Sequence, residues 1–217
     1  MGAFILTIEM SEPDSKRCFL STIDMDIKIY HNNEKTPYPE ISSLIRESFK
    51  ERLDAGLNFG CATFSAKQLC DHVKNDYVFV AYDEDKIVGT VTISIKEKLG
   101  YKYGSHEFLA ISNKMKGKGM ATYIFQTVLE FAKEQELDFL TSTTAVDALS
   151  SIKYHKKNGF HIYRYDSFQS TNYYSYHFIR PIRKMLIFNY VLFRLPIFYI
   201  TLVVCKLTKR KDGSKRF

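Results

Sequence analysis

One short segment, residues 109–121, limits the folds that are open to this chain. It reads Leu-Ala-Ile-Ser-Asn-Lys-Met-Lys-Gly-Lys-Gly-Met-Ala, an apolar strand followed by a basic glycine turn and the start of an amphipathic helix. Such a turn presents successive backbone N–H groups at a helix N-terminus, where the helix dipole favours negative charge. Glycines let the backbone approach a ligand closely, and Lys116 and Lys118 add positive charge. The segment therefore predicts a binding site for a phosphate or pyrophosphate.

Two common phosphate-binding turns do not match this segment. The chain has no Gly-x-x-x-x-Gly-Lys-Ser/Thr sequence, which argues against a nucleotide-hydrolysing P-loop. The dinucleotide-binding pattern needs a third glycine where Thr122 stands, and no acidic residue follows a second strand at the expected distance. A tight strand-to-helix connection that binds nothing is the remaining alternative.

The turn resembles the acyl-CoA-binding motif of the GCN5-related N-acetyltransferase (GNAT) family. That family carries Arg/Gln-x-x-Gly-x-Gly/Ala after its fourth strand, and residues 116–121 match it with lysine in the first position. Its second motif, a helix that ends in Tyr-x-Lys-x-Gly-Phe, is similar to residues 151–160, and the two motifs have the family's order and spacing. The resemblance covers about residues 26–180.

Hydrophobic periodicity predicts seven strands and four helices. The predicted strands span residues 26–30, 77–82, 86–95, 106–111, 138–143, 162–168 and 173–179, and the predicted helices begin near residues 37, 65, 119 and 148. The resulting order, β-α-α-β-β-β-α-β-α-β-β, mixes hairpins with crossover connections. It predicts an α/β fold with a mixed, largely antiparallel central sheet and helices on both faces. The same order is typical of the resembled family.

The distribution of charge divides the chain and argues against a nucleic-acid binder. Residues 178–217 hold ten Lys and Arg residues against one Asp, whereas the rest of the chain holds 21 basic and 23 acidic residues. A nucleic-acid-binding domain spreads positive charge over its folded face. We expect an N-terminal extension (1–25), a GNAT-like domain (26–182) and a hydrophobic, basic tail (183–217).

The tail predicts contact with a membrane surface. Residues 185–205 are almost wholly apolar and long enough to span a bilayer, but Arg194 and Pro196 interrupt the middle of this run. Two short helices that lie on an anionic membrane surface through residues 183–211 fit this pattern better. Packing against the domain or against a second copy in a homodimer, and a true membrane span, are the alternatives.

The cysteines and the N-terminus bear on the location of the protein. Four cysteines without a Cys-x-x-Cys pair, and no secretory leader before them, are typical of free thiols in a reducing cytosol. Together with the tail, they predict a cytoplasmic protein that is peripheral on the inner face of the membrane.

The resemblance implies acetyl-CoA as the co-substrate and an opening beside the fourth strand that accepts its pantetheine arm. By position, Leu109, Ala110 and Ile111 lie at this opening. The residues expected to hold the pyrophosphate are those of the turn: Lys116, Gly117, Lys118, Gly119, Met120 and Ala121. No His/Cys/Asp cluster has the spacing of metal ligands, so no metal is expected.

Acetyl transfer to an amine requires a deprotonated amine, a polarised carbonyl and a protonated leaving thiolate. His155 occupies the position at which family members often have a tyrosine that protonates the sulfur, and a histidine can perform this role. Tyr154, or no side-chain acid at all, are the alternatives. Glu107, expected on the same strand face as Ser105 and Leu109, is the candidate base, against the alternative of a solvated carboxylate.

The acceptor pocket is expected at the loop between the first two predicted helices, residues 54–65, and at the last predicted hairpin, which is rich in tyrosine. Phe59 is a candidate wall, and Glu47 and Glu51 are candidates to hold a cationic amine, although carboxylates of this kind also cover helix surfaces. We expect direct attack in a ternary complex, without an acyl-enzyme. The sequence thus predicts an N-acetyltransferase for a small-molecule primary amine, for example an amino sugar. A longer-chain N-acyltransferase and a non-catalytic acyl-CoA-binding module are the alternatives.

Overall fold

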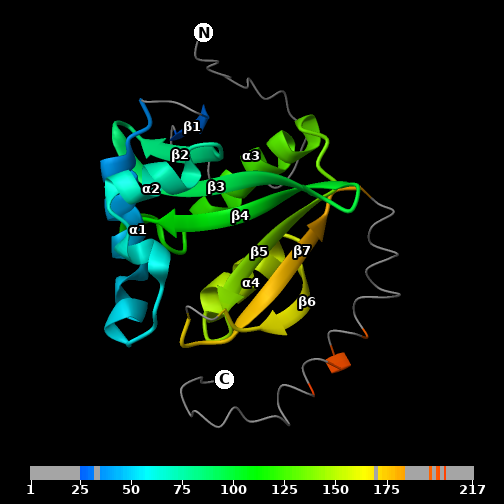
Figure 1. The fold of residues 1–217 in the computed structure, drawn as a ribbon. Coiled ribbons are helices and arrows are strands. Elements are labelled where there is room, and N and C mark those ends of the chain that lie inside the picture. Colours follow the sequence, from blue (N-terminus) through cyan, green and yellow to red (C-terminus); the bar gives the residue numbers. More distant parts are fainter. Residues whose placement is uncertain are drawn as a thin grey trace.

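The computed structural model describes residues 25–31, 35–168 and 171–183, together with the single positions 196, 199, 200 and 203. Seven strands form the sheet: β1 (Met25–His31), β2 (Tyr77–Asp83), β3 (Lys86–Lys98), β4 (Tyr101–Ile111), β5 (Phe139–Ala145), β6 (His161–Asp166) and β7 (Ser175–Pro181). Their spatial order is β1-β2-β3-β4-β5-β7-β6 (Figure 1). All neighbouring strands are antiparallel except β4 and β5, which run parallel.

Helices cover both faces of this sheet (Figure 1). They are α1 (Tyr38–Asp54), α2 (Ala66–Val73), α3 (Met120–Glu134) and α4 (Leu149–Lys157), with short 3-10 turns η1 (Gly60–Thr63) and η2 (Asn113–Met115). The alternation of β2 separates two cores, because successive side chains of a strand point to opposite faces. Val78 and Val80 pack with α1 and α2, whereas Phe79 and Ala81 pack with α3.

Local sequence explains where the helices next to the site begin. Ser65 accepts a hydrogen bond from the Gln68 N–H and the Gln68 side chain accepts one from the Ser65 N–H, which is a complete capping box for α2. Gly119 precedes α3 with a φ of +85°, a left-handed conformation that glycine adopts without strain. The backbone of the turn before α3 therefore favours glycine at position 119.

Two irregularities in the middle of the sheet position the site. β4 and β5 pair only from Tyr103/Phe139 to His106/Ser142, although both strands continue beyond this point. In addition, the pairing of β4 with β3 shifts register, and Phe108 has a φ of +52° at the shift. This is a β-bulge, which bends a strand and leaves its extra residue outside the ladder. β4 consequently turns away from β5 (Figure 1).

The predicted fold class and the order of elements are confirmed. The main difference concerns β3 and β4, which extend beyond the predicted ends and meet at a tight turn over Leu99 and Gly100. The predicted extension and tail, and with them the membrane-surface prediction, lie largely outside the described residues. Within the described part of the chain, no helix is both long and apolar enough to cross a bilayer.

Candidate active site

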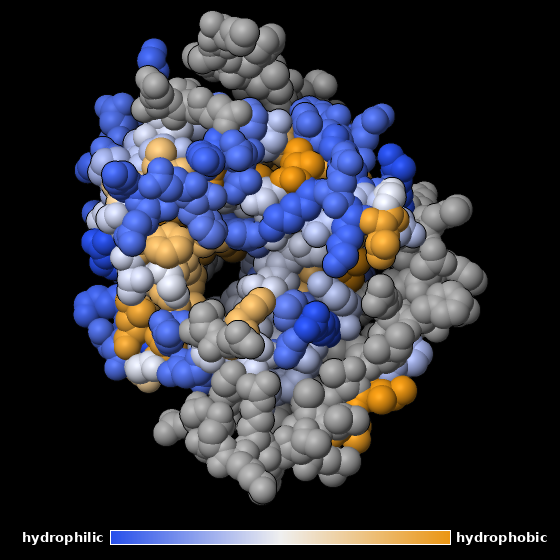
Figure 2. Space-filling model, viewed as in Figure 1, coloured by the Kyte–Doolittle hydropathy of each residue, from blue (hydrophilic) through white to orange (hydrophobic). Residues whose placement is uncertain are grey.

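A cavity of about 1680 Å³ lies where β4 and β5 separate. Its lining comes from both sides of the sheet, because α1 and η1 contribute residues on one side and the start of α3 and α4 contribute residues on the other. Figure 2 shows a hollow in the middle of this face of the molecule. The separation of the two strands therefore leaves a cavity between them that residues from both sides of the sheet line.

The glycine turn between η2 and α3 borders this cavity. Gly117 and Gly119 have φ values of +78° and +85°, and nothing lies within 4 Å of a Cβ placed on either. In the part of the chain that the structure describes, the backbone N–H groups of Gly117, Gly119, Met120 and Ala121 have no hydrogen-bond acceptor. Four free donors at a helix N-terminus are suited to bind an anion.

Most of the residues predicted to bind the pyrophosphate lie at this cavity. Lys116, Gly117, Gly119, Met120 and Ala121 line it, whereas the exposed Lys118 does not. Sequence reasoning missed two further cations on the same side. Lys153 and Lys157 of α4 also line the cavity, one helical turn apart. Their i, i+4 spacing in the sequence places them on one face of the helix and could have indicated this.

The β-bulge changes which residues of β4 share a face. Leu109 and Ile111 line the cavity and pack toward α3, as predicted for the opening. Ala110 does not line it, because its side chain is buried against α1 and α2 on the other face. Glu107 pairs with Thr92 and Ala110 with Thr90, so these two residues share a face. The expectation that Glu107 shares a face with Leu109 is therefore wrong, since the bulge reverses the alternation after Glu107.

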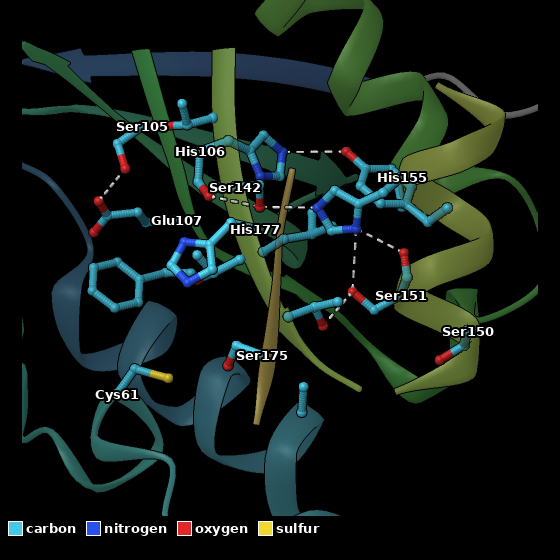
Figure 3. A pocket seen from close by; sticks show the side chains of 18 of the residues that line it. Cys61, Ser105, His106, Glu107, Ser142, Ser150, Ser151, His155, Ser175 and His177 are labelled. Atoms are coloured by element: carbon cyan, nitrogen blue, oxygen red, sulfur yellow. Dashed lines mark hydrogen bonds between the residues drawn. The ribbon is translucent and has the colours of Figure 1, made fainter. Parts of the chain in front are cut away.

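Glu107 is the one carboxylate among the described residues that line the cavity. Its Oε1 accepts a hydrogen bond from Ser105 Oγ at 2.5 Å and lies 3.3 Å from Lys96 Nζ (Figure 3). Its side chain keeps 29% of its surface exposed. These two contacts fix the carboxylate at the point where β4 leaves β5, with part of it open to the cavity.

The structure does not support His155 as a charged acid. His155 is 3% exposed, and burial lowers the pKa of its imidazole to about 4. Its Nδ1 lies 2.7 Å from the carbonyl oxygen of Ser151, which can only accept, so Nδ1 carries the hydrogen. His155 Nε2 lies 2.9 Å from Ser142 Oγ, and the single hydroxyl hydrogen of Ser142 has a second acceptor in the carbonyl oxygen of His106, 3.1 Å away (Figure 3). His155 therefore contacts Ser142 at the end of the β4–β5 pairing.

Tyr154 is also turned inward, as expected for the neighbour of His155. Its hydroxyl lies 3.2 Å from Nε2 of His106. Burial raises the pKa of Tyr154 and lowers that of His106 to about 3, so the phenol donates and the imidazole accepts. The base of the cavity thus consists of neutral, hydrogen-bonded groups.

The model of the Acetyltransferase (GNAT) family matches residues 39–160, which is more than half of the chain. The chain belongs to the GNAT family. It is an acetyl-CoA-dependent N-acetyltransferase of that family. A comparison with curated proteins gave no match.

Solved structures with the GNAT fold are similar over most of the chain. An N-acetyltransferase from Staphylococcus aureus Mu50 is 12% identical, with a TM-score of 0.56, and covers 73% of this chain and 97% of its own. IAA acetyltransferase from Bacillus cereus ATCC 14579 is 16% identical, with a TM-score of 0.54 and coverages of 72% and 99%. The ribosomal-protein-S18-alanine N-acetyltransferase from Escherichia coli is 11% identical, with a TM-score of 0.55 and coverages of 72% and 94%. At these identities the similarity shows the fold and not the acceptor.

The acceptor side of this GNAT cavity differs from the prediction. Glu47 and Glu51 are exposed and lie outside the lining, and Glu47 accepts a hydrogen bond from Asn113 Nδ2 at 2.9 Å. The residue of α1 that reaches the cavity instead is Arg52. Phe59 does form a wall, stacked on Tyr173 with 4.6 Å between ring centroids. The helix α1 is present as predicted, but its orientation about its own axis places the Arg52 guanidinium at the cavity and leaves the two glutamates outside.

Sequence reasoning also missed His177 of β7. It pairs with Thr143 of β5, and both residues line the cavity. His177 is 9% exposed, burial lowers the pKa of its imidazole to about 4, and its Nε2 has no hydrogen-bond partner in the described structure. In the sequence, the one indication that His177 could belong to the site is its position in a tyrosine-rich hairpin.

Proposed function

We propose that this GNAT enzyme transfers the acetyl group of acetyl-CoA directly to a primary amine while both substrates are bound. The observation that carries the proposal is the set of four unpaired N–H groups from Gly117 to Ala121, which borders the cavity between β4 and β5. These donors and Lys116 bind the diphosphate of acetyl-CoA. The pantetheine arm then runs between the two strands past Leu109 and Ile111 toward the base of the cavity.

Glu107 is the proposed base, acting directly or through a water molecule. An amine attacks only after it loses a proton, and Glu107 is the one carboxylate that lines the cavity among the described residues. A proton moves from the ammonium nitrogen to the carboxylate oxygen before attack. The neutral nitrogen then forms the N–C bond, the C–S bond of the thioester breaks, and the CoA thiolate takes up the second proton of the nitrogen. A backbone N–H at the Phe108 bulge polarises the thioester carbonyl, because the bulge removes a residue from the strand ladder.

Two features support direct transfer without a charged acid. Cys61 lines the cavity, but burial raises the pKa of its thiol to about 11, so the thiolate that an acyl-enzyme would need is disfavoured. The leaving group is itself a thiolate, and thiols ionise near pH 8.5, so its departure makes only a modest demand on an acid. Ser142 lines the cavity, but its one hydroxyl hydrogen already has acceptors in His155 Nε2 and the carbonyl oxygen of His106.

Paired substitutions at Gly119 test the cofactor site. Asn and Asp have nearly the same shape and both tolerate left-handed backbone, so Gly119→Asn and Gly119→Asp differ mainly in charge. We expect Gly119→Asp to weaken acetyl-CoA binding, measured by calorimetry, about tenfold or more relative to Gly119→Asn. Equal affinities would place the diphosphate elsewhere.

The reaction is tested by release of free CoA over a panel of amines. We expect release with one class of amine, and a loss of about 100-fold in kcat for Glu107→Gln with unchanged acetyl-CoA affinity. Tight acetyl-CoA binding without release for any amine would instead indicate a binding module.

A further inference from the structure

The acceptor side of the cavity carries an arginine in an aromatic surround. Arg52 of α1 is half-buried, and its guanidinium carbon lies 5.8 Å from the ring centroid of Phe49 and 5.5 Å from that of Phe59. Phe59 in turn stacks on Tyr173. All four residues line the cavity, so α1, η1 and the loop before β7 together form one cationic, aromatic wall.

No acidic residue neutralises this arginine. Within the described ranges, Arg52 makes no ion pair and no side-chain hydrogen bond, and its recorded side-chain contacts are with the two phenylalanine rings. The one carboxylate of the described lining, Glu107, is already paired with Lys96. Lys98 adds a further cation at the cavity. The acceptor side therefore has an excess of positive charge.

Arg52, Cys61 and Glu107 all line the cavity. Both act electrostatically on the Cys61 thiol, with Arg52 lowering its pKa and Glu107 raising it, although burial is the larger effect. A ligand beside Cys61 thus experiences the charge of a cation and of a carboxylate that line the same cavity. This arrangement is complementary to a small molecule that carries charges of both signs.

From this geometry we infer that the acceptor is an amine with a second, anionic group, a carboxylate or a phosphate, which Arg52 binds while the amine faces Glu107. The inference rests on the proposed function and specifies its substrate class. A guanidinium presents a planar set of N–H donors that matches carboxylate and phosphate oxygens, and partial burial strengthens such a pair. Polyamines and other multiply cationic acceptors are disfavoured, because Glu47 and Glu51 do not line the cavity.

Matched compounds test the inference. The probes are an amino acid against its amide, an aminoalkyl phosphate against the corresponding amino alcohol, and a polyamine, each assayed by CoA release. We expect kcat/KM for one of the two anionic amines to exceed that of its neutral partner by about tenfold or more. The carboxylate and phosphate arms identify which anion is used. Equal values within both pairs, or preference for the polyamine, would overturn the inference.

Substitution of Arg52 locates the effect. Arg52→Gln keeps part of the stem that packs on the rings and removes the charge, so we expect KM for the anionic amine to rise about 10- to 100-fold with little change in KM for acetyl-CoA. Arg52→Lys should restore part of this loss. Lys50→Gln is the matched control, because Lys50 lies on the same helix, exposed and paired with Asp54 outside the cavity. If Lys50→Gln raises KM as much as Arg52→Gln does, the inference fails.

A binding measurement separates this inference from the proposed reaction. Calorimetric titration of the same compounds into the full chain with CoA bound reports affinity without turnover. One outcome is that the anionic amine binds selectively, that this binding is lost in Arg52→Gln, and that the separate assay with acetyl-CoA shows no CoA release. This outcome would contradict the reaction and support the inference. Release of CoA with neutral amines that is unchanged in Arg52→Gln would contradict the inference and support the reaction.

Discussion

At the scale of single residues, His155 shows how burial alters the chemistry of a position. A histidine near neutral pKa exchanges protons readily in solution. Here its Nδ1–H is bound by the Ser151 carbonyl, its Nε2 faces Ser142, and its pKa falls to about 4. His155 therefore takes part in a buried hydrogen-bond network with Ser142 and Ser151.

Replacing His155 distinguishes a structural role from proton transfer. We expect His155→Gln to lower the free energy of unfolding by about 1–3 kcal/mol, because buried partners lose hydrogen bonds, and to reduce kcat less than about tenfold. The pH profile of kcat should keep its shape. The measurements are thermal unfolding and kcat between pH 6 and pH 9. A fall in kcat of about 100-fold or more with normal stability would instead identify His155 as the acid.

Single residues also show which parts of the site could be predicted from the sequence and which could not. The glycine turn was predictable, because glycines and lysines at a helix start have a direct physical meaning. It was not predictable that Arg52, and not Glu47 or Glu51, reaches the cavity. Neighbouring positions on a helix differ by about 100°, and packing decides the rotation of α1. The reversal after Glu107 depends on Phe108, which adopts a positive φ although it is not glycine.

At the scale of elements, Gly104 allows β4 to approach its neighbours closely. A Cβ at this position would lie 2.7 Å from Leu140 Cδ2, 3.0 Å from Leu137 Cδ1 and 3.1 Å from Ile93 Cγ2. All three of these neighbours are fully buried, so they have little room to move. Gly104 belongs to the short stretch of β4 that still pairs with β5.

Alanine substitution tests this close approach. We expect Gly104→Ala to lower the free energy of unfolding by about 1–3 kcal/mol, since a methyl group forced into a packed core displaces its neighbours. Gly60→Ala is the control, because nothing lies within 4 Å of its Cβ position, and its effect should stay within about 0.5 kcal/mol. The measurement is chemical denaturation. Equal stabilities of the two variants would show that the core adapts.

Elements were predicted well wherever periodicity was strong. The stripe of apolar residues in α1 and α3 and the β-branched runs of β2 and β3 suffice to identify them. The first half of β4 was missed because residues 101–105 contain Gly104 and no β-branched residue. Its strand conformation comes from pairing with β3 and β5, which local sequence does not encode.

At the scale of the whole molecule, three buried histidines make stability depend on pH. Burial lowers the pKa values of His106, His155 and His177 to about 3, 4 and 4. In the unfolded chain each titrates near pH 6.5, so between pH 6.5 and about 4 the unfolded state binds more protons. Stability therefore rises with pH through this window and is lost as the pH falls.

The expected result is a marked loss of thermal stability in mild acid. Each histidine contributes up to about 1.4 kcal/mol per pH unit within the window. We expect the melting temperature to fall steeply between pH 6.5 and pH 4.5, and His177→Asn to make the fall shallower. Differential scanning calorimetry across this range measures both. A constant melting temperature would show that the three rings accept protons in the folded state.

The cavity between β4 and β5 has a consequence for turnover. Its lining includes residues of α1 and η1 on one face of the sheet and residues of α3 and α4 on the other. In the proposed reaction, acetyl-CoA approaches from the α3 side and the amine from the α1 side. We therefore expect free CoA and the acetylated product to dissociate in either order.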